Sequence, residues 1–353
     1  MKYLWYKTIR SYVHIGLLFY FRKIKVFGHE SIPKDKPILF VANHRNGLID
    51  PILIATAPLQ ILHFLTRASA FKNPIADFLL RSINMLPVYR IRDGKDSIAK
   101  NQEIFAACYE IFAKGESVLI FPEGNHGLPR RVRPLSKGFT RIAYGFLDKY
   151  PDKALYIVPI GLNYTNILRP FRDVSLYYGK AFLANDYYNP SDENQAIDAL
   201  KNRVYEDLKV LTTHIENLDQ HDVIENILKE EKIDFLVPNA TNARIQQLEQ
   251  NPQEIENHKV QKFSKRSKNI WQSFISVVFV INTIFPILIW LFIKSKVKDV
   301  VMLSTSRFGT SVALIPFFYL IQAGIVTCFF GWLWGLLYFV LSLVWALMRK
   351  YIH

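Results

Sequence analysis

The stretch that decides the fold is PILFVANHRNGLIDPILIA, residues 37–55, in which an apolar run passes into a polar turn and then into a second apolar run. The first run, Pro37 to Val41, predicts a strand that is buried on both faces of a sheet. Gly47 can adopt positive φ inside the turn, and Pro51 suits the first position of a helix. The stretch therefore predicts a strand, a turn and a helix, with Asp50 as the N-cap.

The turn contains a histidine and a carboxylate that can act as a pair. Five residues separate His44 from Asp50, so on one continuous helix the two side chains would point to different faces, and only a turn can bring them together. A neutral imidazole can remove a proton from a hydroxyl group near neutral pH, and a carboxylate can fix its tautomer and stabilise the imidazolium that forms. The alternative is that Asp50 only caps a helix and His44 is an ordinary turn residue.

Short apolar runs recur from Ile38 to about Phe182, with longer mixed segments between them. The runs are ILFVA, ILHFLT, MLPVYR, SVLIFPEG, LYIVPIGLNY and VSLYYGKAF. This alternation predicts an α/β domain over residues 24–190, a mixed sheet flanked by helices. The helices are expected near Pro51–Ala57, Ile75–Ser82, Ser97–Ala113 and Lys137–Lys149. Loops at the strand ends are where such sheets hold ligands.

Two long segments near the C-terminus, residues 270–293 and 312–348, contain no charged residue. Because about 20 residues of helix cross the apolar core of a bilayer, both segments are candidate transmembrane regions. The first either spans the membrane or forms a re-entrant segment bent at Pro286. The second suits two close spans or a hairpin, with its bend near Gly324 or Gly331. The alternative, a helical hairpin buried in a soluble core, fits such long uncharged runs poorly.

Three further segments complete the predicted organisation. Residues 1–23 mix aromatic residues with Lys and Arg, which predicts an interfacial membrane-associated helix or, alternatively, an amphipathic helix on the protein core. Residues 191–262 are polar, lack glycine and have a helical period, so they predict a helical region. Residues 263–353 form the membrane region with two or three hydrophobic helices. Its boundary is marked by Trp271 and by the cations Lys259, Lys262, Lys265, Arg266 and Lys268.

The composition favours phosphate-bearing partners and excludes several classes of site. There are 44 Lys and Arg residues against 30 Asp and Glu, a net charge of +14, which suits an anionic bilayer, a phosphorylated substrate or nucleic acid. Two cysteines build no disulfide framework or thiolate cluster. No GxSxG, P-loop, HExxH or CxxC motif occurs, and His44 and His126 lack a third metal ligand. No nucleic-acid-binding module is recognisable, so nucleic acid is not an expected partner.

A basic loop, FPEGNHGLPRRVRPLSKG at residues 121–138, follows the apolar run that ends at Phe121. Glu123 can hydrogen-bond a polyol hydroxyl, and Gly124 lets the backbone approach a ligand. Arginine forks match phosphate oxygens, so the candidate phosphate ligands are Arg130, Arg131 and Arg133, together with Arg67 and Arg90 at the ends of two other strands. The alternative is that these arginines are solvated surface cations.

The blocks NHRNGLIDP, LPVYR, FPEGNHG and IVPIG, in this order, resemble the glycerolipid acyltransferase family, which includes lysophosphatidate and glycerol-3-phosphate acyltransferases. The resemblance covers about residues 24–182. It implies that His44 is the general base and Asp50 its orienting partner. It also assigns substrate binding to Arg67, Arg90, Glu123 and Gly124. The family's Thr-Arg-Ser is replaced here by Asn125-His126-Gly127, so Arg130, Arg131 or Arg133 is expected to supply the missing arginine.

The resemblance implies a membrane-bound O-acyltransferase of phospholipid biosynthesis. It would transfer a fatty acyl group from acyl-CoA or acyl carrier protein to glycerol-3-phosphate or 1-acylglycerol-3-phosphate, with its active site at the cytoplasmic face of a membrane. The spacing of five residues between His44 and Asp50, against the commoner four, resembles the glycerol-3-phosphate and dihydroxyacetone phosphate branch. A lysophospholipid-remodelling enzyme and a non-catalytic lipid-binding protein remain alternatives. No cofactor is expected apart from the acyl donor.

Overall fold

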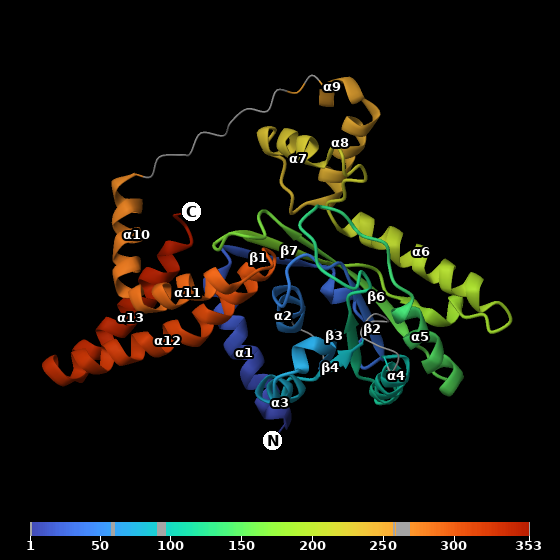
Figure 1. Ribbon diagram of the computed structural model, residues 1–353, viewed down its shortest axis with the longest axis horizontal. Helices are drawn as coiled ribbons and strands as arrows, with labels where there is room; N and C mark the ends of the chain where they lie inside the picture. The colour runs from blue at the N-terminus through green and yellow to red at the C-terminus, as the bar shows by residue number, and fades with distance from the viewer. Residues whose placement is uncertain (1, 58–60, 90–96, 257, 259–268, 353) are drawn as a thin grey trace.

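The computed structural model describes residues 2–57, 61–89, 97–256, 258 and 269–352. Figure 1 shows an α/β body, a small group of helices above it and a group of long C-terminal helices on one side. Two of the predictions, the phosphate ligand Arg90 and the cations that precede Trp271, lie outside the described residues.

The body is built on one mixed sheet, as predicted. Its strands are β1 (Lys23–Phe27), β2 (Ile38–Ala42), β3 (Leu62–Arg67), β4 (Met85–Val88), β5 (Ser117–Ile120), β6 (Tyr156–Tyr164), β7 (Asp173–Tyr178) and β8 (Phe182–Leu183). The strand order is β1-β7-β6-β2-β5-β3-β4, and β8 pairs with β6. Strands β2 to β6 run parallel to one another, whereas β7 is antiparallel to β6 and parallel to β1.

Strand β2 lies between β5 and β6, and all five of its side chains are buried. Alternate residues point to opposite faces: Ile38 and Phe40 belong to one hydrophobic cluster, and Leu39 and Val41 to the other. The first cluster lies under α2 (Ile49–Thr56), and the second lies under α5 (Gly138–Lys149) and α6 (Glu193–Leu211). A strand with apolar residues on both faces is thus covered by helices on both faces.

The remaining helices of the body cover the far end of the sheet. They are α3 (Pro74–Ser82) and α4 (Ser97–Ala113), and short 3₁₀ turns occur at His29–Ser31, Ala68–Phe71 and Ala184–Tyr187. Helix α3 begins as its sequence suggests, because the Asn73 side chain accepts the backbone N–H groups of Ile75 and Ala76 at the N-cap.

The polar segment after residue 190 divides between two environments. Helix α6 packs on the sheet, and a Cβ at Gly161 would lie 2.2 Å from the Leu211 carbonyl oxygen, so glycine permits this close approach. Helices α7 (His221–Glu230), α8 (Pro238–Gln250) and α9 (Pro252–Glu256) instead enclose a small core of their own. The α/β body therefore continues through α6, beyond the boundary expected from the change in composition.

The N-terminal helix α1 (Lys2–Tyr20) packs on the protein core with one side, as one of the two predictions has it, and exposes an apolar face on the other. One side is buried on the body through Tyr6, Leu17 and Tyr20. The other side exposes a row of large apolar residues, namely Tyr3, Leu4, Trp5, Tyr12, Ile15 and Leu18. Such an exposed face suits contact with a lipid surface, and this contact stays a prediction.

The C-terminal region forms four helices: α10 (Ile270–Asn282), α11 (Ile284–Lys296), α12 (Met302–Phe330) and α13 (Trp332–Arg349). By length and composition α12 and α13 could each cross a membrane, and α10 with α11 could form a third, broken span. The bend of 82° between α10 and α11 lies at Thr283, so its predicted place at Pro286 is wrong. Pro286 stands in the first turn of α11, where its missing N–H leaves no helical hydrogen bond broken.

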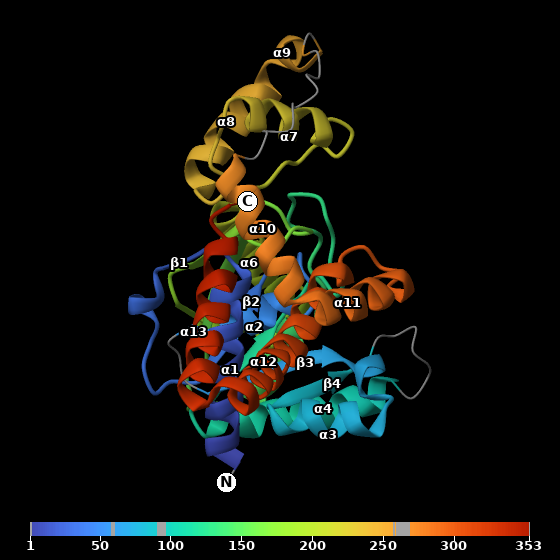
Figure 2. The same ribbon diagram turned by 90° about the vertical axis from the view of Figure 1, so that its left-hand side faces the viewer.

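The hairpin predicted for residues 312–348 is present, with its bend at Gly331. Gly331 has φ of +90°, a conformation that only glycine adopts readily, whereas Gly324 continues helix α12. Helix α12 also begins ten residues before Val312, because its first turns pack on the body through the buried residues Ser304 and Phe308. Figure 2, viewed from this side, shows α12 and α13 in front of α1.

Candidate active site

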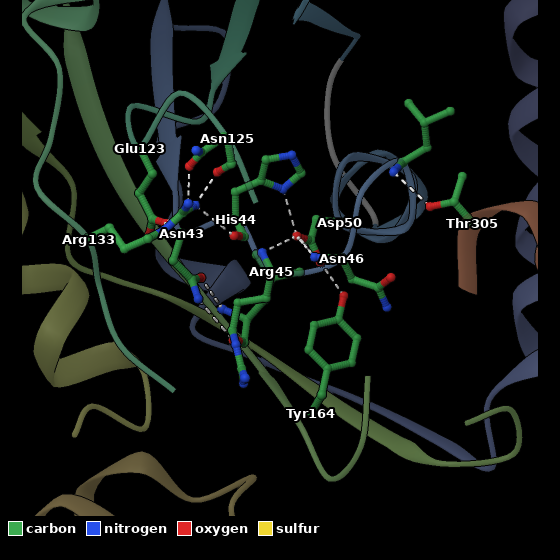
Figure 3. A network of polar contacts seen from close by, with 12 residues as sticks. Asn43, His44, Arg45, Asn46, Asp50, Glu123, Asn125, Arg133, Tyr164 and Thr305 are labelled. Atoms are coloured by element: carbon green, nitrogen blue, oxygen red, sulfur yellow. Dashed lines mark hydrogen bonds and ion pairs between the residues drawn. The ribbon is translucent and has the colours of Figure 1, made fainter. Parts of the chain in front are cut away.

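The turn after β2 brings His44 and Asp50 into contact, as Figure 3 shows. The Nδ1 atom of His44 lies 2.8 Å from Oδ2 of Asp50, and Asp50 is completely buried, while 16% of the His44 side chain remains exposed. Asp50 is not the N-cap that the sequence predicts, because Leu48 holds that position and Asp50 lies in the first turn of α2. Its carboxylate points back into the turn instead of capping the helix.

Backbone groups of the turn hold the Asp50 carboxylate in place. Oδ2 accepts the backbone N–H groups of Arg45 and Asn46, each at 2.7 Å. The turn itself is tied to the sheet by Asn43, whose side chain accepts from Leu162 N at 2.7 Å and donates to Leu162 O at 3.2 Å. These bonds fix both the path of the turn and the direction of the carboxylate, so His44 meets a preorganised partner.

The second carboxylate oxygen of Asp50 accepts a hydrogen bond from the hydroxyl group of Tyr164, at the end of β6. Burial and the neighbouring Asp50 raise the pKa of Tyr164 well above its usual value, so the phenol stays protonated and donates. With its carboxylate oxygens occupied by donors, Asp50 is set to accept the Nδ1–H of His44. This tautomer leaves Nε2 of His44 to accept a proton from a substrate.

The loop after β5 packs against His44. The His44 ring stacks on Phe121 with centroids 4.3 Å apart, and it meets the His126 ring edge-on at 5.6 Å. The side chain of Glu123 is buried, and burial raises its pKa to about 7 despite the neighbouring Arg133, whose charge and hydrogen bonds lower it. The same loop contains Gly124, where φ is +71° and the space beside the Cα is open, so the backbone there can approach a ligand.

Arg133 lies beside His44 but its donors are occupied by the protein. Nε donates to Glu123 at 2.6 Å, Nη2 donates to the His44 carbonyl oxygen at 3.2 Å, and Asn125 accepts two further hydrogen bonds. These contacts connect the loop after β5 to the backbone of His44. They indicate that Arg133 positions the site and is poorly placed to bind a phosphate as well.

Arg130, one of the candidate phosphate ligands, has its side chain turned into the protein. Its side chain is buried, and its donors reach Glu225 at 3.1 Å and the carbonyl oxygens of Tyr164 and Thr165 at 2.7 and 3.1 Å. The loop turns this residue inward, where it joins β6 to α7. Arg131 is paired with Glu216 at 3.2 Å, in the segment between α6 and α7.

Arg67 stands at the end of β3 with an exposed side chain. Both β2 and β3 pair with β5, and Ile38 and Leu62 share the partner Ser117. Continuing this register brings Arg67 and His44 to the same edge of the sheet, two strand spacings or roughly 10 Å apart. No hydrogen bond or ion pair joins the Arg67 side chain to the described residues, so its guanidinium is available to a ligand.

A possible cation cluster lies away from this edge. In the described part of the chain His221, Asp222 and Glu225 have ligand atoms within 4.8 Å of one another. However, His221 Nε2 already accepts the backbone N–H of Arg130 at 2.8 Å, and Glu225 pairs with the Arg130 side chain. The cluster is therefore explained by its contacts to Arg130.

Three residues that contact the catalytic turn or the loop beside His44 were not predicted from the sequence: Tyr164, Asp299 and Thr305. Tyr164 donates to Asp50, Asp299 Oδ2 lies 2.8 Å from Nε2 of His126, and Thr305 Oγ1 accepts the Leu48 N–H at 3.1 Å. Tyr164 follows the IVPIG block in an apolar strand, so its position at a strand end is the one available signal. Asp299 and Thr305 lie about 250 residues beyond the turn and carry no signal of their own.

Comparison with known proteins identifies the domain that contains this site. The family model Acyltransferase matches residues 23–163. The chain is similar to the 1-acyl-sn-glycerol-3-phosphate acyltransferase BAT2 of Brassica napus, with 27% identity over 151 residues, 42% of this chain and 40% of the relative. It is also similar to glycerol-3-phosphate O-acyltransferase 1 of Saccharomyces cerevisiae, with 26% identity over 129 residues, 35% of this chain and 17% of the relative.

Among solved structures, the 1-acyl-sn-glycerophosphate acyltransferase PlsC of Thermotoga maritima aligns with a TM-score of 0.42 and 21% identity, over 58% of this chain and 79% of that one. The region of this chain that aligns with BAT2 spans about two fifths of the length of that plant relative. The residues matched by the family model include the His44–Asp50 turn, the loop after β5 and most of the sheet. Residues 23–163 therefore match the Acyltransferase family model, and the chain is similar in sequence to acyltransferases of glycerolipid synthesis.

Proposed function

We propose that this protein is a membrane-bound O-acyltransferase of glycerolipid synthesis, which transfers a fatty acyl group from acyl-CoA or acyl carrier protein to glycerol-3-phosphate or 1-acylglycerol-3-phosphate. The observation that carries the proposal is the His44–Asp50 pair. The Nδ1 atom of His44 lies 2.8 Å from the buried Asp50 carboxylate, and its Nε2 atom is left for a substrate hydroxyl at the ligand-binding edge of the sheet.

In the proposed reaction, Nε2 of His44 removes the proton of the acceptor hydroxyl as the oxygen attacks the thioester carbonyl carbon. The C–S bond then breaks, and the imidazolium returns the proton to the departing thiolate. Asp50 stabilises the imidazolium between these two steps, and Tyr164 together with the backbone N–H groups of Arg45 and Asn46 keeps Asp50 in position. A backbone N–H of the turn would stabilise the oxyanion. The reaction needs no covalent acyl-enzyme.

Attachment to a membrane follows from the chemistry of the product, which partitions into lipid. Helices α12 and α13 are long and apolar enough to cross a bilayer, and the exposed face of α1 would lie against its surface. We place the active site at the cytoplasmic face, where soluble thioester donors and glycerol-3-phosphate are available. Membrane lipids, the acyl donor and the phosphate-bearing acceptor are therefore the partners of this protein.

An acceptor panel tests the proposed function. Membranes containing the full chain are incubated with labelled acyl-CoA or acyl carrier protein and with glycerol-3-phosphate, dihydroxyacetone phosphate, lysophosphatidate or lysophospholipids. We expect label in the product of a phosphate monoester acceptor. Label only in products of headgroup-bearing lysophospholipids would favour a remodelling enzyme, and no label with any acceptor above membranes lacking the protein would contradict an acyltransferase activity.

The phosphate group of the acceptor is expected to contact Arg67. Replacing Arg67 by Ala should raise KM for the acceptor by about tenfold or more with a smaller effect on kcat, because a charge-assisted hydrogen bond contributes about 1.5–3 kcal/mol. The matched control is Arg131→Ala, which removes an arginine that is paired with Glu216. Initial rates over a range of acceptor concentrations give both constants. Equal KM values for Arg67→Ala and the wild type would exclude Arg67 from phosphate binding.

A further inference from the structure

The C-terminal helices make direct contact with the turn that carries the catalytic pair. Thr305, in the first turns of α12, accepts the backbone N–H of Leu48 at 3.1 Å (Figure 3). A Cβ placed on Gly47 would lie 2.6 Å from Thr305 Oγ1 and 2.9 Å from Met302 Sδ. Gly47 and Leu48 are inside the span between His44 and Asp50, so α12 lies against the middle of this turn.

A second contact joins the segment before α12 to His126, whose ring lies beside His44. Asp299 accepts the backbone N–H of Val301 at 2.9 Å through Oδ1, and its Oδ2 lies 2.8 Å from Nε2 of His126. The hydrogen bond and the charge of His126 lower the pKa of Asp299, so this carboxylate remains ionised. The His126 ring meets the ring of His44 edge-on. The start of α12 is therefore joined to both loops that border the imidazole.

The same part of α12 is attached firmly to the body. Ser304 donates to the carbonyl oxygen of Ile167, and Arg307 donates to that of Leu168 at 2.9 Å. Phe308 is buried and meets the ring of Tyr20 edge-on at 5.3 Å. We call residues 299–308 the docked segment. Because it is held at several points, it can act as a rigid support for the turn rather than follow its motion.

We propose that the docked segment positions the catalytic turn, so that the membrane region is part of the active site as well as an anchor. This inference rests on the proposed acyltransferase function. Thr305 holds the Leu48 N–H, which leads directly into the helix turn containing Asp50, and Asp299 holds His126 beside His44. A small displacement of the turn would change the approach of Nε2 to the acceptor hydroxyl, and misplacement of about 1 Å can lower a rate by about a hundredfold.

The test compares Thr305→Val with Thr305→Ser in the full chain, reconstituted in lipid nanodiscs. Valine has the shape of threonine but cannot accept the Leu48 N–H, whereas serine can. Thr305→Val should lower kcat by about tenfold with KM within about twofold, and Thr305→Ser should restore at least half of the wild-type rate. Asp299→Asn, which removes the charge beside His126, should lower kcat in the same direction. The matched control is Thr310→Val, because among the described residues the Thr310 hydroxyl bonds within α12, to Ser306 O at 2.8 Å.

Hydrogen exchange provides a readout that does not depend on activity. In Thr305→Val, peptides covering residues 43–50 should exchange faster than in the wild type, while peptides from β2 and β6 keep their wild-type rates. Unchanged exchange in residues 43–50 together with a wild-type kcat would overturn the proposal. Faster exchange throughout the body would also overturn it, because Thr305 would then only stabilise the fold. If the wild type transfers no acyl group, the proposed function fails, whereas the exchange comparison still decides whether α12 holds the turn.

Discussion

Replacing His44 by Ala is expected to lower acyl transfer by at least about a thousandfold, near the upper part of the range observed for general bases. The fall should appear in kcat, with the KM values for donor and acceptor changed little, because the imidazole acts on the hydroxyl as it becomes nucleophilic. Asp50 cannot take over as the base, since it is buried behind the imidazole and its oxygens are already bonded. Initial rates with labelled acyl-CoA and the preferred acceptor give both constants.

The control for this variant is His63→Gln. His63 is exposed to a similar extent, 14% against 16% for His44, but it lies in β3 and pairs with Glu116, which precedes β5 at the opposite edge of the sheet. His63→Gln should therefore keep activity within about threefold of the wild type, because His63 lies at the edge of the sheet opposite to His44 and its ring is paired with Glu116. If His44→Ala retained a tenth or more of the wild-type kcat, His44 would not be the general base.

Replacing Asp50 by Asn should have the second largest effect, a fall in kcat of about a thousandfold or more. The amide oxygen can still accept the N–H groups of Arg45 and Asn46, and the hydroxyl of Tyr164 can rotate to accept the new NH₂ group. The fold should therefore be kept, with a melting temperature near that of the wild type. What is lost is the negative charge that stabilises the imidazolium of His44 at 2.8 Å.

Tyr164→Phe separates the two contributions of this carboxylate. It removes one donor to Asp50 but keeps the charge, so it should lower kcat by roughly tenfold, much less than Asp50→Asn. Both variants are measured with saturating substrates, alongside their melting temperatures in detergent. Comparable losses of activity in the two variants would mean that the position of the Asp50 carboxylate, and not its charge, matters most.

Much of the fold could be predicted because the signals are local. The five apolar residues of β2 are buried on both faces of the sheet, as their unbroken run predicts, and the mixed α/β architecture is confirmed. The positive φ of Gly331 ends α12 and starts the hairpin, again at a position that the residue type indicates. The errors at Asp50 and Pro286 have one cause. A residue that can cap or bend a helix does so only where its neighbours need it.

The site divides in a similar way. His44 and Asp50 are six positions apart with Gly47 between them, so the turn that brings them into contact can be predicted from the segment PILFVANHRNGLIDP alone. The environment of the arginines is not local. The Arg130 side chain is buried, and its guanidinium donates hydrogen bonds to Glu225 and to the backbone at the end of β6. Arg67, in contrast, is exposed at the end of its strand. The two side chains are chemically identical, but contacts with residues distant in the sequence bury one and leave the other exposed.

From its residues alone this chain specifies an α/β body, apolar C-terminal helices and a histidine–carboxylate pair, because strand and helix periodicity and turn chemistry act between near neighbours in the sequence. The resemblance to glycerolipid acyltransferases likewise comes from short motifs and their order along the chain. The three-dimensional packing assigns Tyr164, Asp299 and Thr305 to the surroundings of His44. Those contacts join residues more than 100 positions apart, and a lone tyrosine, aspartate or threonine has no pattern that marks its distant partner. They exist only once the sheet has formed and α12 has packed against it.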